Sequence, residues 1–362
     1  MTVFGRWLRS LLDNPQLLLL LGIVLAALLA VTLFSQALAP VIAAIVIAFL
    51  LDGPVMWLER RGLSRAPATL LVFVAFLAFI ALMLVLFLPP LSGQLAQFFE
   101  TLPHMIGRLR QGLLTLPAYY PGLVTEAFIR GLLDSAATDL SGLGRDLLGH
   151  TLAGLRSVVT IAVYVVLVPV MVFFFLKDKR AILGWVAGFL PRERTLVVGV
   201  WREVVARAGD YARGKVYEIL IVGTVAYIVF LALGLRFPAL LATLTGLSVV
   251  IPYVGAAVVT LPVAFVAFFQ WGLTAEFLAA VGAYLLLQAL DGNLLAPLLF
   301  SEVVKLHPVA IILAILVFGS IWGLWGVFFA IPLATLIDAV IKACRHSLTA
   351  EYEPARGEDR AV

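Results

Sequence analysis

Long apolar runs recur along the whole chain and are separated by short polar segments. Runs of membrane-spanning length include Leu17–Ala39, Ala66–Leu88, Leu152–Leu176 and Val216–Leu235. About twenty apolar residues in a helix cross the roughly 30 Å hydrocarbon core of a bilayer. The pattern therefore predicts an all-α polytopic integral membrane protein with about eight membrane-embedded helical segments.

The composition points to the same class. The 362 residues are 63% hydrophobic and 13% charged, whereas a soluble domain is about 45–50% apolar and about 25% charged. Because Arg6 and Arg9 precede Leu17–Ala39, this run resembles a secretory signal. It is longer than a usual signal core, however, and it is followed by Pro40 instead of a small-residue cleavage site. We interpret it as the first span.

Basic residues near the span ends predict the orientation. The loop Glu59–Arg65 holds three arginines and one acid, and Lys177–Lys215 holds nine basic residues. In Leu91–His150, by contrast, four basic residues accompany five acidic ones. Lys and Arg accumulate on the cytoplasmic side of membrane proteins. We therefore expect the first two segments and both termini in the cytoplasm, and the third segment outside.

These features divide the chain into five regions. Residues 1–90 form an N-terminal three-span region, and 91–150 form extracytoplasmic amphipathic helices. Residues 151–215 hold the fourth span and a basic cytoplasmic helical segment. Residues 216–343 form the transport region, and 344–362 form a cytoplasmic tail.

Two amphipathic segments lie outside these spans. From Leu91 to Leu116 apolar residues are spaced by threes and fours, which indicates an amphipathic helix. Pro103 should kink it, and Pro117 and Pro121 should end it. This helix either caps the bundle or contacts another subunit, and the spacing fits both. The basic segment Trp201–Tyr211 is expected to lie on the inner leaflet as an interfacial helix.

The second half contains two similar units, offset by 70 residues. In each unit an apolar span precedes a broken apolar stretch that is flanked by prolines 24 residues apart, Pro238 with Pro262 and Pro308 with Pro332. If each stretch is a hairpin that enters and leaves on the same side, the single span between the two hairpins makes them open on opposite sides of the membrane. That is the inverted repeat with which secondary transporters build a site near the midplane. The alternative is a single kinked span in each unit, and charge counting does not separate the two.

One polar cluster lies within an apolar run of the second unit. Gln288 and Asp291 share a helix face, Asn293 follows closely, and helix-breaking Gly292 and Pro297 stand beside them. An Asp at the centre of a membrane helix costs about 2.5–3.5 kcal/mol on insertion scales. We favour a substrate- or ion-facing site over a structural hydrogen-bonded cluster, and Asp291 could also bind and release a proton. The breaks of the two units complete the predicted site, which comprises Gln288, Asp291, Asn293, Pro252, Tyr253, Gly255, Gly323 and Gly326.

The other acids within or near the spans are interpreted as structural. Asp52 lies near the cytoplasmic end of the second span and is expected to pair with Arg60 or Arg61. Glu218 is expected to pair with Arg213 or Lys215. Asp338 precedes Lys342 by one turn, as in a helical ion pair.

Several chemical classes are excluded or disfavoured. Gly209–Lys215 matches G-x-x-x-x-G-K, but Val216 follows where a nucleotide site needs Ser or Thr. The four histidines are scattered and form no metal motif, and the single Cys344 excludes an intramolecular disulfide. We therefore expect neither an enzyme nor a cofactor or metal, and no nucleic-acid partner.

Five short motifs, in order, carry a family resemblance over about residues 41–342. They are Leu51-Asp52-Gly53-Pro54, Tyr211-Ala212-Arg213-Gly214-Lys215, Ile251-Pro252-Tyr253-Val254-Gly255, Asp291-Gly292-Asn293 with His307-Pro308, and Ile331-Pro332. Together they resemble the PerM-like permeases of the autoinducer-2 export family. The resemblance implies a bacterial inner-membrane transporter that forms homo-oligomers. Family members have been assigned autoinducer-2 export or Na⁺(Li⁺)/H⁺ antiport. The family often shows Glu-Asn before its proline, whereas this chain has Asp291-Gly292-Asn293.

The leading hypothesis is a secondary transporter or facilitator that exports a small polar molecule, with membrane lipids around it. One alternative is an Na⁺(Li⁺)/H⁺ antiporter in which Asp291 is the exchanging carboxylate. Another alternative is a membrane scaffold or channel-like oligomer without coupled transport.

Overall fold

The computed structural model describes residues 15–119, 154–191, 195–252, 254–300 and 307–350. Within these ranges every regular element is helical. Seven helices there are long and apolar enough to cross a membrane, and shorter apolar helices accompany them. The prediction of an all-α polytopic membrane protein is confirmed. The elements are α2 (Pro15–Leu33), α3 (Ser35–Arg60), α4 (Arg65–Tyr119), α6 (Gly154–Lys177), α7 (Lys179–Gly188), α8 (Thr195–Ala232), α9 (Pro238–Ser248), α10 (Val254–Trp271), α11 (Ala275–Leu290), the π-helical turn η1 (Asp291–Leu295), α12 (Ala296–Phe300) and α13 (Pro308–Ala350).

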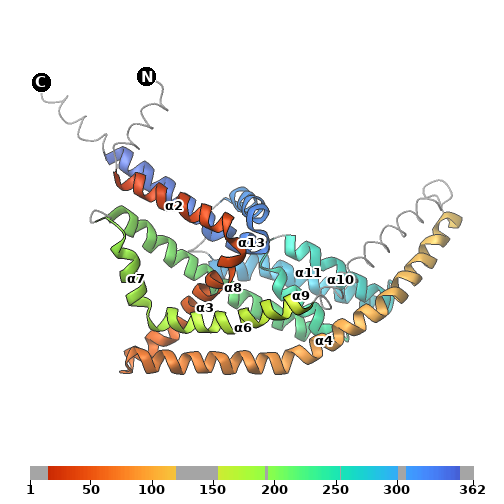
Figure 1. Ribbon diagram of the computed structural model, residues 1–362. Helices are drawn as coiled ribbons and strands as arrows, with labels where there is room; N and C mark the ends of the chain where they lie inside the picture. The colour runs from red at the N-terminus through yellow and green to blue at the C-terminus, as the bar shows by residue number, and fades with distance from the viewer. Residues whose placement is uncertain (1–14, 120–153, 192–194, 253, 301–306, 351–362) are drawn as a thin grey trace, which may run out of the picture.

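The first half is a bundle of α3, α4 and α6. Small and β-branched residues at their contacts let the backbones approach, and Ala44, Ala68 and Val172 are completely buried there. Close packing of small side chains is the usual basis of helix association in membranes. Figure 1 shows α6 lying along α3 and α4 at the lower edge of the molecule.

Helix α4 is much longer than a single span. Its 55 residues correspond to about 80 Å at 1.5 Å per residue, so its second half extends beyond the membrane. The helix continues through Pro103, bends upward in Figure 1, and ends at Tyr119, two residues after Pro117. Met105 and Phe98 pack on the core of the second half, so the described part of this amphipathic segment covers the bundle.

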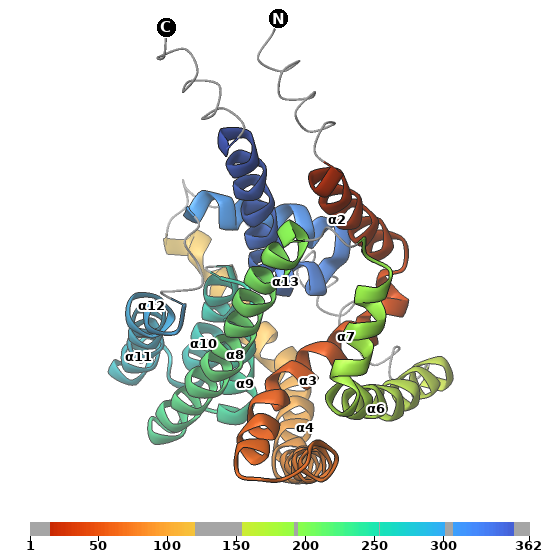
Figure 2. The same ribbon diagram turned by 90° about the vertical axis from the view of Figure 1, so that its left-hand side faces the viewer.

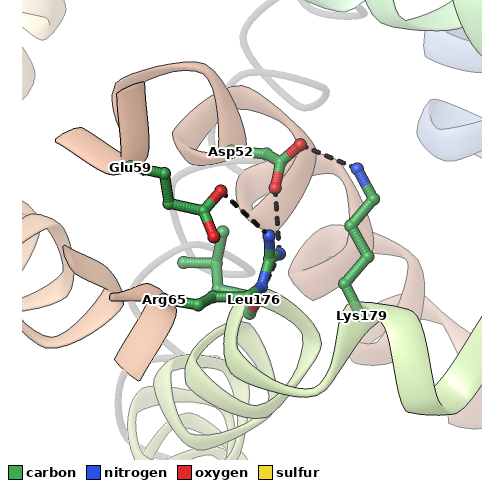
Figure 3. Close-up of polar contacts among 5 residues, drawn as sticks. All are labelled: Asp52, Glu59, Arg65, Leu176 and Lys179. Atoms are coloured by element: carbon green, nitrogen blue, oxygen red, sulfur yellow. Dashed lines mark hydrogen bonds and ion pairs between the residues drawn. The ribbon is translucent and has the colours of Figure 1, made fainter. Parts of the chain in front are cut away.

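An ionic cluster fixes the ends of the first-half helices (Figure 3). The carboxylate of Asp52 is 3.2 Å from Arg65 Nη2 and 2.7 Å from Lys179 Nζ. Arg65 also donates to the carbonyl oxygen of Leu176, at 3.1 Å from Nε and 2.7 Å from Nη2. The structural role expected for Asp52 is confirmed, but its partners are not Arg60 or Arg61. Arg61 lies over the ring of Trp57, 4.0 Å from the centroid.

Helix α8 joins the two halves. It runs unbroken for 38 residues, so Trp201–Tyr211 is part of a longer helix, and its position on the inner leaflet stays a prediction. Val197 and Val200 near the start of α8 are buried against α2 and α13. Leu17 and Val340 belong to the same cluster, and Figures 1 and 2 show the start of α2 beside the end of α13.

The first broken stretch is a helical hairpin formed by α9 and α10. With 11 residues, α9 is about 16 Å long and too short to cross a bilayer. A Cβ on Gly255 would lie 1.8 Å from the carbonyl oxygen of Ser248. Seven residues of continuous helix would separate these positions by about 10 Å, so the chain reverses here. At the start of α9, which is the end of the hairpin opposite its tip, the side chain of Gln94 in α4 accepts hydrogen bonds from the backbone N–H groups of Ala239 and Leu240, at 2.9 and 3.1 Å.

The second broken stretch reverses in the same way within α13. Gly323 has φ 60° and ψ −137°, a conformation that glycine adopts most easily. A Cβ on Gly326 would lie 1.8 Å from the carbonyl oxygen of Phe318. Gly255 and Gly326 are the break glycines that the sequence places 17 and 18 residues after Pro238 and Pro308. The two units therefore share a tight glycine contact at the tip, and each stretch folds back on itself.

Candidate functional site

A cavity of about 310 Å³ lies where the two hairpins meet α8 and α11. One wall comes from α8, a second from the tip of the first hairpin, and a third from the turn between α11 and α12. Ile311 and Ile331 of α13 close it from the second hairpin. Its polar lining residues are Tyr211, Lys215, Glu218, Ser248, Gln288 and Asp291.

A buried ion pair on α8 lies at this cavity. Lys215 Nζ is 2.5 Å from Glu218 Oε2, and it also donates to the carbonyl oxygen of Val249 at 2.7 Å. Each side chain is 4% exposed. The expected pairing of Glu218 with Lys215 is therefore confirmed. A buried pair contributes little net stability, but removing one partner is strongly destabilising because the other charge stays unpaired.

Asp291 and Gln288 approach the cavity from the opposite wall. Helix α11 passes into the π-helical turn at Asp291, a distortion that is frequent at functional sites. Gln288 Nε2 donates to the hydroxyl of Tyr284 at 2.8 Å, and this hydroxyl donates to the carbonyl oxygen of Ala256 at 2.7 Å. The remaining acceptors, Gln288 Oε1 and Asp291 Oδ1, are buried and have no hydrogen-bond partner.

Aromatic rings form the apolar part of the lining. The rings of Tyr211 and Phe300 are 5.6 Å apart between centroids, and Lys215 Nζ is 5.1 Å from the centroid of Phe300. Gly214 permits this contact, because a Cβ there would lie 2.6 Å from a ring carbon of Phe300. The Tyr211 hydroxyl is buried and has no hydrogen-bond partner.

The cavity is lined by one basic and two acidic side chains. Lys215 carries one positive charge, while Glu218 and Asp291 carry two negative charges when both are ionised. A buried charge is costly unless it is paired and hydrogen-bonded. Lys215 is held by Glu218, and among the described residues the carboxylate of Asp291 has no such partner at Oδ1.

Three of the seven described residues that the sequence predicts for the site line this cavity. Gln288, Asp291 and Pro252 line it. Asn293 does not, and its side-chain amide donates to the carbonyl oxygen of Ala289 in α11 at 2.8 Å. Gly255 and Gly326 lie at the hairpin tips and Gly323 at the reversal of α13. Tyr253 lies outside the described residues.

Sequence reasoning did not include Lys215, Glu218, Tyr211 or Ser248 in the site. The sequence offers Lys215 as one of two partners for Glu218, and the pair is interpreted there as structural. The signal that could have placed this pair in the site is its depth within a membrane span, because Glu218 lies one turn beyond Lys215 inside an apolar run. Within the described ranges, no group of three or more His, Cys, Asp or Glu residues could hold a metal ion.

Comparisons with known proteins cover nearly the whole chain. The profile of the AI-2E family transporters matches residues 19–346. A protein of Escherichia coli (strain K12) named as permease PerM is 45% identical over 338 residues, which is 93% of this chain and 96% of that protein. Bacillus subtilis (strain 168) has a protein named as transport protein YrrI that is 28% identical over 83% of this chain and 85% of its own. The AI-2 transport protein TqsA of Escherichia coli (strain K12) is 24% identical over 91% of this chain and 93% of that protein.

Proposed function

The chain belongs to the AI-2E transporter family, and on that premise we propose that it is a secondary transporter or facilitator that exports a small polar molecule through the cavity at Lys215, Glu218 and Asp291. Its environment is the lipid bilayer, as the seven apolar helices of spanning length require. We place it in the bacterial inner membrane with both termini in the cytoplasm, because the basic segments Glu59–Arg65 and Lys177–Lys215 follow the positive-inside rule.

The observation that carries this proposal is the position of the charged cavity between two helical hairpins. Transporters with inverted repeats bind their solute near the midplane, where broken helices supply free backbone and polar groups. Here the tip of the first hairpin and the arms of the second both contribute to the lining. Relative movement of the hairpins against the bundle of α3, α4 and α6 would open the cavity to each side in turn.

The cargo we favour is a small polar signalling compound or related metabolite. Support comes from the relative named as an AI-2 transport protein and from the mixed lining of charged, amide and aromatic groups. The family resemblance further supports a homo-oligomer.

The second candidate function is Na⁺(Li⁺)/H⁺ antiport with Asp291 as the exchanging carboxylate. One observation favours it, which is the buried and unpartnered Oδ1 of Asp291. A membrane scaffold without coupled transport is the third candidate, and a polar cavity deep in an apolar chain counts against it, because such groups are costly in a membrane unless they serve a function.

Transport by the full chain in proteoliposomes tests the proposal. Radiolabelled candidate solutes are screened for uptake with no gradient, with a pH gradient and with an Na⁺ gradient. Saturable solute flux supports the exporter. Proton flux driven by Na⁺ or Li⁺ without any solute supports the antiporter, and the absence of saturable flux under all three conditions contradicts transport.

A further inference from the structure

The cavity offers hydrogen-bond acceptors without donors to meet them. Gln288 Oε1 and Asp291 Oδ1 are both buried and unpartnered, and the two residues line the same wall. An unmet buried acceptor costs about 1–3 kcal/mol. A ligand that fits this wall therefore brings donors to both oxygens.

The charge at the same wall selects the sign of the ligand. Lys215 donates to Glu218 Oε2 and to Val249 O, so its attraction to Asp291 acts at longer range, without a direct ion pair. With both carboxylates ionised, a positively charged ligand would bring the sum of charges at the cavity to zero. An anion would instead raise the imbalance in a region shielded from water.

The aromatic lining offers one ring that is not already paired with a cation. The ring of Phe300 lies beside the ammonium group of Lys215, 5.1 Å from its centroid, whereas the ring of Tyr211, 5.6 Å from that of Phe300, is the one left for a ligand. Ammonium groups near aromatic faces gain roughly 0.5–2 kcal/mol. Tyr211 is 1% exposed, and its buried hydroxyl has no partner, so it supplies one more polar contact for the ligand.

A bare metal ion fits this lining less well than an organic cation does. Hard cations take about six or more oxygen ligands, whereas the unpartnered oxygens here belong to three residues, Tyr211, Gln288 and Asp291. The cavity volume of about 310 Å³ is also far larger than the roughly 30 Å³ that a water-sized particle occupies. The volume of the cavity and the aromatic rings in its lining favour a ligand with a carbon skeleton.

We infer that the solute of this cavity is a small organic ammonium compound, whose N–H groups donate to Gln288 and Asp291 and whose charge is balanced by Asp291. The inference rests on the proposed transport function and narrows its substrate class. Glu218 has a separate task, which is to hold Lys215 away from Asp291 so that this carboxylate stays available to the ligand.

Equilibrium dialysis of the purified full chain in detergent tests the substrate class without any transport step. The probes are radiolabelled ethanolamine, ethylene glycol, which replaces the ammonium by a hydroxyl, and tetramethylammonium, which keeps the charge but has no N–H donor. Saturable ethanolamine binding is expected, with both other probes at least about tenfold weaker, or about 1.4 kcal/mol. Equal binding of ethylene glycol, displacement of ethanolamine by equimolar Na⁺, or the absence of saturable ethanolamine binding overturns the inference.

Two variants locate the binding to this wall. Asp291→Asn removes the charge at nearly constant volume and should weaken ethanolamine binding by about tenfold or more, while Gln288→Met removes the free acceptor and should weaken it several-fold. Asp338→Asn, which breaks the exposed pair with Lys342, is the matched control and should bind as the unaltered chain does. Unchanged binding in whichever of the two wall variants folds contradicts the inference. If ethanolamine binds as expected but is not moved across proteoliposomes, the transport function fails and the substrate class stands.

Discussion

Lys215 and Glu218 form an ion pair inside the protein, one turn apart on α8, with Nζ and Oε2 2.5 Å apart. Because the start of α8 also carries contacts to α2 and α13, this pair lies on the element that connects the two halves of the chain. The same pair lines the cavity, so the helix that connects the two halves also supplies two of the charged groups of the site.

Replacing Lys215 by Met should destabilise the protein strongly. The change leaves Glu218 buried without a partner, which costs about 3–5 kcal/mol in comparable pairs. The melting temperature of the purified protein in detergent measures this loss. The double variant Lys215→Met/Glu218→Gln should recover most of the stability and still fail to transport. A double variant that is stable and fully active would show that the pair is only structural.

The glycines at the hairpin tips should not tolerate a side chain. Alanine at Gly255 or Gly326 places Cβ 1.8 Å from a backbone carbonyl oxygen, so the hairpin must open, at a cost of about 3 kcal/mol by analogy with overpacked cores. Both variants should melt at lower temperature. Gly282→Ala in α11 is the control, because nothing lies within 4 Å of its Cβ position and alanine favours a helix by about 1 kcal/mol. Equal melting temperatures for all three variants would contradict the close approach of these two glycines to the backbone carbonyl groups.

Removing the carboxylate of Asp52 should loosen the junction of α3, α4 and α7. Asp52→Asn leaves Arg65 and Lys179 without their shared acid (Figure 3), and Asp52 itself is 5% exposed. We expect a lower melting temperature. Glu59→Gln, whose carboxylate is 3.4 Å from Arg65 and more exposed, should have a smaller effect, since exposed pairs contribute about 0–1 kcal/mol. A larger drop in melting temperature for Glu59→Gln than for Asp52→Asn would contradict the role of Asp52 as the main acid of this junction.

The two hairpins should open on opposite sides of the membrane. If so, Leu273, which is 80% exposed just after the first hairpin, faces outside, and His307, just before the second, faces the cytoplasm. In a Cys344→Ser background, Leu273→Cys should react with an impermeant maleimide in intact cells, and His307→Cys only after permeabilisation. Two kinked spans would give the reverse pattern.

Sequence reasoning predicts the class and the positions of the two breaks well because both depend on regular signals. Apolar runs report membrane spans directly, and the proline and glycine spacing marks both broken stretches, whereas the choice between hairpins and kinked spans needs the structure. The partners of Asp52 are different, since Arg65 and Lys179 come from α4 and α7 and meet Asp52 only through packing of the bundle. Likewise, no local pattern brings Lys215 and Asp291 to one cavity, 76 positions apart in sequence. The exclusion of Asn293 also follows from geometry, because its amide bonds back to Ala289.

Transport by the Asp291→Asn variant is the most direct test of the central claim that this cavity carries the solute. Proteoliposomes with the unaltered chain, Asp291→Asn and the control Asp338→Asn are compared for saturable flux of the solute identified by screening. We expect Asp291→Asn to insert and melt like the unaltered chain but to lose about 90% of the flux or more, as follows from a tenfold weaker interaction, while Asp338→Asn keeps it. Equal flux through all three proteins would contradict the claim.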